Sequence, residues 1–177
     1  MSWAASSGSG VLFSNCMASN HKQTPAQLTR FLAAETDTLG LGAALAPGLR
    51  PGMVIYLCGD LGSGKSTLAR GVLRALGVTE RVKSPTFTLV EPYTISSLYL
   101  YHFDFYRFRH PNEWLDAGLR DYFNSESVCL VEWPEKAGGQ LPAPDLRIEI
   151  DIDGSGRSVT INADTEAGRT CLVRLQR

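Results

Sequence analysis

The sequence predicts an α/β fold in which helices flank a mixed β-sheet within a single domain. Three observations lead to this prediction. A glycine-rich segment, Gly59–Ser66, separates an apolar, strand-like run at Met53–Cys58 from a helix-like run at Thr67–Leu76. The run Val128–Val131 is short and continuously apolar, as a buried central strand is. Two alternating segments surround Asp153–Gly156, which is typical of a β-hairpin. A parallel core beside a hairpin-rich half makes a mixed sheet.

The composition fits one globular domain with a sizeable core. The chain has 177 residues, of which 44% are hydrophobic. Lysine and arginine number 17 and aspartate and glutamate 18, so a net charge of −1 gives no electrostatic case for extended binding to nucleic acid or membrane. No apolar stretch approaches the roughly 18 residues of a membrane span. The cysteines are far apart, which predicts neither a disulfide framework nor a zinc site, and we expect a soluble protein of a reducing compartment. They are Cys16, Cys58, Cys129 and Cys171.

The N-terminal residues 1–27 are rich in Ser, Ala, Gly and Asn and contain no acidic residue. This composition predicts a disordered tail, followed by the folded domain at residues 28–177. Whether Met17 is the true start of translation stays open.

The domain is expected to begin with a short strand at Leu28–Leu32. Thr36 or Asp37 can cap a following helix that runs to Leu45. The helix after the glycine-rich segment is expected to stop at Gly77, a plausible left-handed cap.

The second half of the chain is expected to hold most of the strands. The further expected strands are Thr86–Glu91, Leu98–Asp104, Leu146–Ile152, Ser158–Ile161 and Cys171–Leu175. Residues Tyr93–Ser97 would join the first two of these strands, and Pro111–Phe123 carries helical spacing.

The segment Gly59–Ser66 is a complete G-x-x-x-x-G-K-[ST] phosphate-binding loop in the expected strand–turn–helix context. Its glycines allow successive backbone N–H groups to point at one anion, and the helix N-terminus adds to the attraction. Lys65 would reach the β- and γ-phosphates, and the Ser66 hydroxyl would ligate Mg²⁺. The fold is therefore expected to resemble that of P-loop NTPases, with an ordinary glycine-rich turn as the alternative. The expected nucleotide-binding residues are Gly59, Asp60, Leu61, Gly62, Ser63, Gly64, Lys65, Ser66, Thr67 and Trp133.

Two acidic residues at expected strand ends are candidates for holding Mg²⁺ together with Ser66. Glu132 ends the apolar run at 128–131, where a second metal-binding acid is usual. Asp104 lies among aromatic residues, where a carboxylate needs a metal or a partner. The alternatives are a solvent-facing glutamate at position 132 and an ion pair of Asp104 with Arg107.

The catalytic candidates are Lys65, Asp104, Glu132 and Thr86. Thr86 follows Ser84 and Pro85 between the loop and the second acid, where a switch segment would sense the γ-phosphate. An ordinary Ser-Pro turn is equally compatible with these residues. Trp133 is expected to pack near the nucleotide or in the core, and His102 and Tyr106 to be structural.

Four sequence blocks together resemble the TsaE (YjeE) family, the ATPase of bacterial tRNA threonylcarbamoyladenosine synthesis. The resemblance extends from about Leu28 to Ile161, and it departs from many relatives in having Ser66 in place of Thr. The blocks are Gly59–Thr67, Ser84–Val90, His102-x-Asp104-x-Tyr106-Arg107 and Glu132–Lys136.

The resemblance implies a cytoplasmic protein that binds ATP and Mg²⁺ and acts with the TsaB and TsaD subunits. That complex modifies the adenosine next to the anticodon of ANN-decoding tRNAs. Contact with tRNA is expected to be indirect or weak, and the oligomeric state stays open. Three alternatives remain: a small-molecule kinase, which would need an arginine-rich lid; a GTPase, although the Asn-Lys-x-Asp sequence is absent; and an assembly factor whose hydrolysis is incidental.

Overall fold

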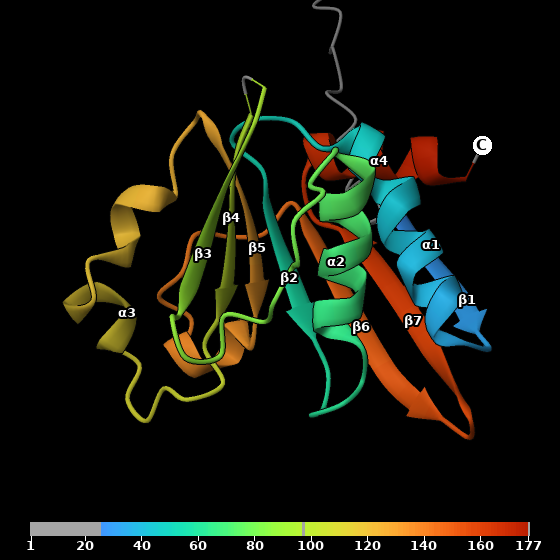
Figure 1. Ribbon diagram of the computed structural model, residues 1–177, viewed down its shortest axis with the longest axis horizontal. Helices are drawn as coiled ribbons and strands as arrows, with labels where there is room; N and C mark the ends of the chain where they lie inside the picture. The colour runs from blue at the N-terminus through green and yellow to red at the C-terminus, as the bar shows by residue number, and fades with distance from the viewer. Residues whose placement is uncertain (1–25, 97, 177) are drawn as a thin grey trace, which may run out of the picture.

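The structure is a computed structural model that describes residues 26–96 and 98–176, and most of the expected tail lies outside that part. It forms one seven-stranded sheet flanked by helices, so the predicted single-domain α/β fold is confirmed (Figure 1). The elements in chain order are β1 (Ala26–Leu32), α1 (Glu35–Leu45), η1 (Ala46–Gly48), β2 (Val54–Cys58), α2 (Lys65–Ala75), β3 (Val90–Ile95), β4 (Leu98–Asp104), α3 (Glu113–Asp116), η2 (Leu119–Tyr122), β5 (Ser127–Glu132), η3 (Pro134–Ala137), β6 (Leu146–Asp153), β7 (Gly156–Ala163) and α4 (Glu166–Leu175).

The sheet has the strand order β1-β7-β6-β2-β5-β4-β3 and is mixed, as predicted. Strand β2 lies in the middle and runs parallel to β5 and β6, and β4 runs parallel to β5. The pairs β3–β4, β6–β7 and β1–β7 are antiparallel. Because parallel strands end at the same edge of a sheet, β2, β5 and β4 bring their carboxyl ends together.

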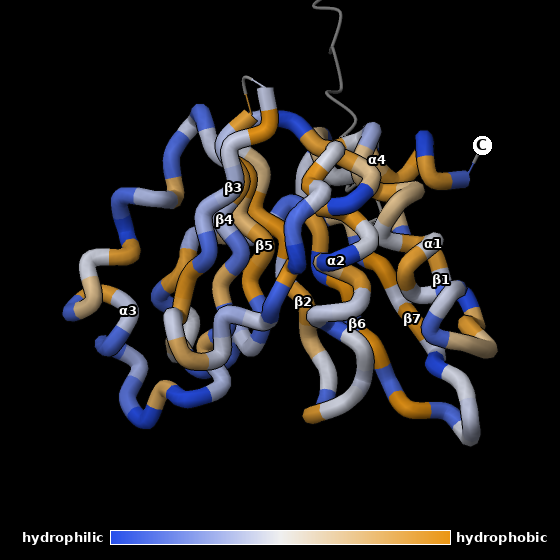
Figure 2. Tube along the Cα trace, in the orientation of Figure 1, coloured by the Kyte–Doolittle hydropathy of each residue, from blue (hydrophilic) through white to orange (hydrophobic). Residues whose placement is uncertain are grey.

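Alternate residues of the central strands pack into two apolar layers. All six residues of β5 are buried, as its apolar sequence predicts. On one face Leu130 packs with α1, α2 and α4, and on the other Val131 packs with aromatic residues such as Phe103 and Trp114. Hydrophobic residues run along β5 and β6 in Figure 2. The core therefore holds the ends of the parallel strands in fixed positions.

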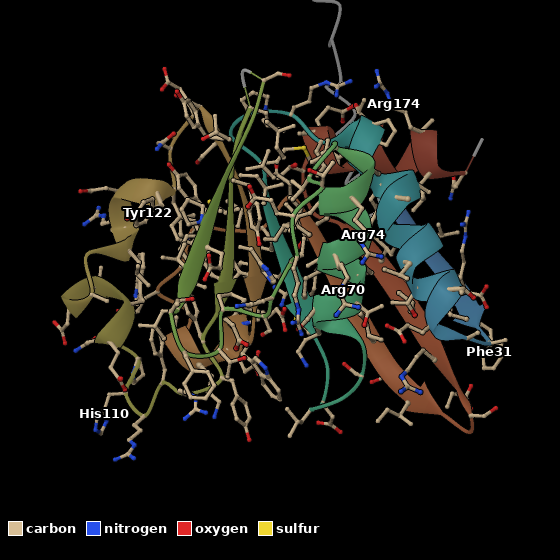
Figure 3. All side chains as sticks on the ribbon, in the orientation of Figure 1. Phe31, Arg70, Arg74, His110, Tyr122 and Arg174 are labelled. Carbon is tan, nitrogen blue, oxygen red and sulfur yellow. The ribbon has the colours of Figure 1, made fainter. Side chains whose placement is uncertain are left out.

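Helices α1 and α2 lie side by side and touch through two glycines. A Cβ atom at Gly42 would overlap the carbonyl oxygen of Leu68, and one at Gly71 would overlap that of Leu39. Arg70 extends from α2 (Figure 3), and its Nη1 donates to Glu35 Oε1, at the start of α1, at 3.2 Å. The helix that follows the phosphate-binding loop is thus held by backbone-to-backbone contact.

The start of α1 differs from the prediction that Thr36 or Asp37 is its N-cap. Ala34 is the N-cap, and Asp37 is the third helical residue. The Asp37 carboxylate accepts hydrogen bonds from the backbone N–H groups of Ala33 at 2.9 Å and Ala34 at 3.0 Å. An acid at this position satisfies free N–H groups from inside the first turn.

The expected strand Thr86–Glu91 is wrong, because β3 begins only at Val90 and continues to Ile95. Leu89 has a φ of 65°, and its amide donates to the Pro85 carbonyl at 2.7 Å, so the chain turns before it pairs with β4. The expected connection at Tyr93–Ser97 is correspondingly shorter: residues 93–95 belong to β3, and Ser97 lies outside the described residues.

The expected strand at Cys171–Leu175 is also wrong, since these residues form the end of helix α4. Thr165 caps this helix by accepting a hydrogen bond from the Gly168 amide at 3.1 Å. The helical spacing over Pro111–Phe123 yields two short pieces, α3 and η2, separated by Gly118 with a φ of 68°. Across residues 26–96 and 98–176, the helices are too short and too polar to cross a bilayer.

Candidate nucleotide-binding site

The glycine-rich segment connects the carboxyl end of β2 to the first residue of α2, as predicted. Gly59, Gly62 and Gly64 have φ angles of 136°, 80° and 112°, which side chains rarely tolerate. A Cβ atom at Gly59 would also overlap the carbonyl oxygen of Ile150 in β6. The loop therefore presents backbone groups rather than side chains, as a phosphate cradle does.

Arg157, which the sequence analysis did not single out, supports this loop from β7. Its Nε donates to the Ser63 carbonyl at 2.8 Å and its Nη2 to the Gly62 carbonyl at 3.2 Å. Both carbonyl oxygens therefore accept hydrogen bonds from a cation. The one signal in the sequence was the position of Arg157 directly after the glycine-containing turn of the β6–β7 hairpin.

Lys65 is folded back onto the loop. Its Nζ donates to the carbonyl oxygens of Gly59 at 2.7 Å and Asp60 at 2.8 Å, and it lies 4.1 Å from the ring centroid of Trp133. Burial lowers the pKa of Lys65, and the nearby carboxylates of Glu132 and Asp104 oppose that shift. A cation whose hydrogen-bond partners are neutral backbone carbonyls thus lines the cavity beside the loop.

Glu132 lies 2% exposed at the end of β5, which excludes the solvent-facing alternative. Its Oε2 accepts a hydrogen bond from Ser66 Oγ at 3.0 Å, and its Oε1 lies 2.8 Å from His102 Nε2. The structure therefore brings the hydroxyl of the loop and the acid of the neighbouring strand together. Their role as metal ligands stays a prediction.

Asp104 ends β4, opposite Glu132, but its hydrogen bonds involve other residues. Its Oδ2 accepts from Ser84 Oγ at 2.8 Å and from Thr86 Oγ1 at 2.6 Å, and its Oδ1 accepts from the Tyr106 amide at 3.0 Å. These bonds tie the expected switch segment to the strand end.

Arg107, the suggested ion-pair partner of Asp104, lies elsewhere. Its guanidinium carbon stacks 4.1 Å from the ring centroid of Phe87, whose exposed fraction is 83%. The Asp104–Arg107 pair is therefore wrong, because the hydroxyl groups of residues 84 and 86 reach the carboxylate from the other side of the chain.

Two cavities border Gly62 and Gly64 of the loop. One, of about 260 Å³, is lined by the charged and polar residues Lys65, Ser66, Glu132 and Asp104. Trp133 and Tyr106 also line it, and the centroids of their rings are 5.1 Å apart. The other, of about 250 Å³, lies between the loop, the start of α1 and Arg157. Gly59 and Asp60 line neither of these two cavities. The remaining predicted nucleotide-binding residues line at least one of them: Leu61, Gly62, Ser63, Gly64, Lys65, Ser66, Thr67 and Trp133.

The oxygen donors of the first cavity fit Mg²⁺. Ser66 and Glu132 supply oxygens from two elements, and Asp104 lies next to them. The described residues contain no group of three or more His, Cys, Asp or Glu side chains able to hold a metal by themselves. Mg²⁺ commonly takes only one or two protein ligands and completes its shell with phosphate oxygens and water. The site therefore suits a metal that arrives with a nucleotide.

The loop itself also fits an anion. The side-chain oxygen of Ser63 is buried and has no hydrogen-bond partner among the described residues. An unsatisfied buried hydroxyl costs free energy, which a phosphate oxygen as acceptor would recover.

Comparisons with known proteins identify the family of the chain. The family model described as "Threonylcarbamoyl adenosine biosynthesis protein TsaE" matches residues 32–159. The tRNA threonylcarbamoyladenosine biosynthesis protein TsaE of Haemophilus influenzae is 42% identical over 150 residues, which cover 82% of this chain and 95% of the relative. The protein of the same name from Bacillus subtilis is 41% identical over 128 residues, covering 72% and 80%.

A solved structure shares the fold as well. The crystal structure of Bacillus subtilis YdiB superposes with a TM-score of 0.74 and 33% sequence identity, covering 87% of this chain and 97% of that one. The family match includes the phosphate-binding loop, Asp104 and Glu132. The chain therefore belongs to the TsaE family.

Proposed function

We propose that this chain is a Mg²⁺-dependent ATPase that supports the biosynthesis of threonylcarbamoyladenosine in tRNA. The role in tRNA modification rests on the family and on the names of its relatives. The ATPase activity rests on one observation above all: Ser66, at the start of the helix after the phosphate-binding loop, donates a hydrogen bond to Glu132, at the end of the neighbouring strand. That pairing joins a phosphate cradle to a carboxylate suited to Mg²⁺.

The two cavities suggest how a nucleotide would lie. The cavity beside Glu132 and Asp104 holds the acids, so it suits the metal and the terminal phosphate. The cavity beside Thr38 and Arg157 lies on the other side of Gly62 and Gly64, and the charged side chains that line it are Glu35 and Arg157. We place the ribose and base there, with the phosphates crossing the loop between the two cavities.

The residues of the chain have distinct roles in this proposal. The loop amides bind the phosphates, and Lys65 moves from the carbonyls of Gly59 and Asp60 to the β- and γ-phosphates. Ser66 and Glu132 would hold Mg²⁺, and the metal would supply positive charge for the phosphate oxygens. Thr86, released from Asp104, senses the γ-phosphate.

Hydrolysis by the isolated chain is proposed to be slow. The described residues that line the cavity beside Glu132 include neither an arginine nor a glutamine. An arginine that stabilises the transition state is worth roughly 10³ to 10⁵ in rate, and a glutamine often orients the attacking water. We therefore propose that the TsaB and TsaD subunits speed turnover in the cytoplasm. A small-molecule kinase would need an arginine-rich lid. The described residues that line this cavity include no arginine, so they give the kinase alternative no support.

The test is ATP turnover by the purified chain, alone and with purified TsaB and TsaD proteins. We expect slow turnover alone, a clear increase with both partners, and no turnover in Ser66→Ala under either condition. Arg74→Ala, which changes an exposed cation outside the two cavities and outside the four sequence blocks, is the matched control and should behave as the wild type. Fast turnover that ignores the partners would contradict the proposal and favour a self-sufficient enzyme.

A further inference from the structure

His102 is a buried histidine that the proposed chemistry has not used. It lies on β4, two residues before Asp104 and on the same face of the sheet, and its exposed fraction is 0%. Its Nε2 lies 2.8 Å from Glu132 Oε1. Its other ring nitrogen, Nδ1, is buried without a hydrogen-bond partner among the described residues.

The register of the sheet explains how the two side chains meet. In the parallel pairing of β4 and β5, Asp104 lies opposite Glu132 and His102 lies opposite Leu130. His102 and Glu132 are therefore diagonal neighbours on one face, within reach of long side chains. A carboxylate accepts hydrogen bonds and cannot donate them, so Nε2 carries the proton of this hydrogen bond.

Each oxygen of the Glu132 carboxylate therefore accepts a hydrogen bond from a different residue. Ser66 donates to Oε2 at 3.0 Å, and His102 donates to Oε1 at 2.8 Å. Two donors from different elements fix the plane of a carboxylate, because rotation about its last bond would break both hydrogen bonds. Each oxygen retains a lone pair that is free to face the cavity.

We infer that His102 is a positioning residue, which holds the Glu132 carboxylate in the orientation that Mg²⁺ requires when it arrives with the nucleotide. The inference rests on the proposed function, since it assigns a role at the same metal site. Residues that orient a metal ligand typically contribute ten- to a hundred-fold to metal affinity. Because Nδ1 has no partner among the described residues, the hydrogen bond to Glu132 is the polar contact that the described residues give this ring.

The test compares two substitutions of His102 whose amide side chains differ in length by one methylene group. In His102→Gln the amide nitrogen can reach the position of Nε2, whereas in His102→Asn it is too short to reach Glu132. For each variant, calorimetry measures the ADP affinity with Mg²⁺ and with a chelator, and the ratio of the two gives the contribution of the metal. Electron paramagnetic resonance of Mn²⁺ bound with ADP gives a second readout that does not depend on turnover.

A control separates this role from a purely structural one. Ser127 is a buried polar residue at the opposite end of β5, and its Oγ donates to the backbone of the Tyr122–Ser127 turn. Ser127→Ala therefore removes a buried hydrogen bond from the same strand without touching the site. It should lower the melting temperature and leave the metal contribution unchanged.

We expect His102→Asn to reduce the metal contribution about ten-fold or more and to broaden the Mn²⁺ spectrum, and His102→Gln to restore most of both. The affinity for ADP without metal should not change. Equal metal contributions in the wild type and His102→Asn, or a reduction that follows melting temperature in all three variants, would overturn the inference while leaving the proposed function intact. A wild-type chain whose ADP affinity is independent of Mg²⁺ would instead overturn both.

Discussion

Asp104 and Glu132 lie opposite each other at the ends of two parallel strands, yet their carboxylates hold different parts of the chain. Glu132 accepts from Ser66, at the start of α2, and Asp104 accepts from the hydroxyls of Ser84 and Thr86. Two adjacent acids thus connect one cavity to the phosphate-binding loop and to the segment expected to act as a switch. A ligand between them would act on both connections at once.

Replacing Asp104 by alanine should release the switch segment. The side chain would no longer accept from Ser84 and Thr86, and hydrogen bonds to a charged acceptor contribute roughly 1.5–3 kcal/mol each. We expect trypsin to cleave after Lys83 at least about ten times faster in Asp104→Ala. Asp104→Asn keeps an acceptor oxygen and should be cleaved nearly as slowly as the wild type. Equal cleavage rates in Asp104→Ala and the wild type would show that the segment is held by other contacts.

Lys65→Ala should weaken the binding of ATP more than that of ADP, because the ammonium group is expected to reach the γ-phosphate. Arg157→Ala should weaken both nucleotides to a similar extent, since it frees the carbonyls of Gly62 and Ser63 rather than removing a phosphate contact. Calorimetry of the two variants with both nucleotides gives the comparison. Equal losses of ATP and ADP affinity in Lys65→Ala would place the lysine outside the cradle.

The close packing of α1 on α2 predicts opposite effects for two glycines of one helix. A Cβ atom at Gly40 meets nothing within 4 Å, so Gly40→Ala should stabilise the protein by about 0.5–1 kcal/mol. A Cβ atom at Gly42 would overlap the backbone of α2, so Gly42→Ala should cost about 1–3 kcal/mol. Denaturant unfolding measures both. Stabilisation by both substitutions would mean that the helices can separate at little cost.

The buried thiol of Cys129 predicts a loss of stability at alkaline pH. Burial raises its pKa from the ordinary value of 9.0 to about 12, so the folded chain keeps this proton where the unfolded chain loses it. The contribution is fully present below pH 9.0 and is lost as the pH rises towards 12. At pH 10.5 the loss is about 2 kcal/mol, since each pH unit is worth 1.36 kcal/mol.

The measurement is denaturant unfolding of the wild type and Cys129→Ala at pH 8 and pH 10.5. The variant lacks the titrating thiol, so its stability should fall less between the two pH values. An equal fall in both proteins would show that the thiol is not the group that titrates.

The sequence was most informative where the structure depends on residues that lie close together along the chain. The glycine-rich segment Gly59–Ser66 is contiguous, and the apolar run of β5 reflects burial on both faces, so the strand–turn–helix arrangement and the buried strand were both predicted correctly. The short segment Cys171–Leu175 was ambiguous, because its helix depends on the Thr165 cap and on Gly168 packing against the carbonyl of Asp145. Propensity over five residues does not contain that information.

The parts of the site that were missed depend on contacts between distant residues. Arg157 reaches the loop across 94 positions of sequence, and no motif marks it. The Asp104–Arg107 pair failed for the same reason, since the partners of Asp104 come from 18 and 20 residues earlier. Hydrogen-bond partners at such separations are set by the topology of the sheet, which the local pattern predicts only in outline.

The pairing of the first described strand with β7 has a consequence for synthesis on the ribosome. Strand β1 forms the edge of the sheet, and its residues Ala26–Leu32 pair with Arg157–Ala163, so β1 has no strand to join until β7 has been made. At roughly 5–20 residues per second, the ribosome needs on the order of ten seconds to reach that point. During this interval, the edge of β1 is open to chaperones and to other nascent chains.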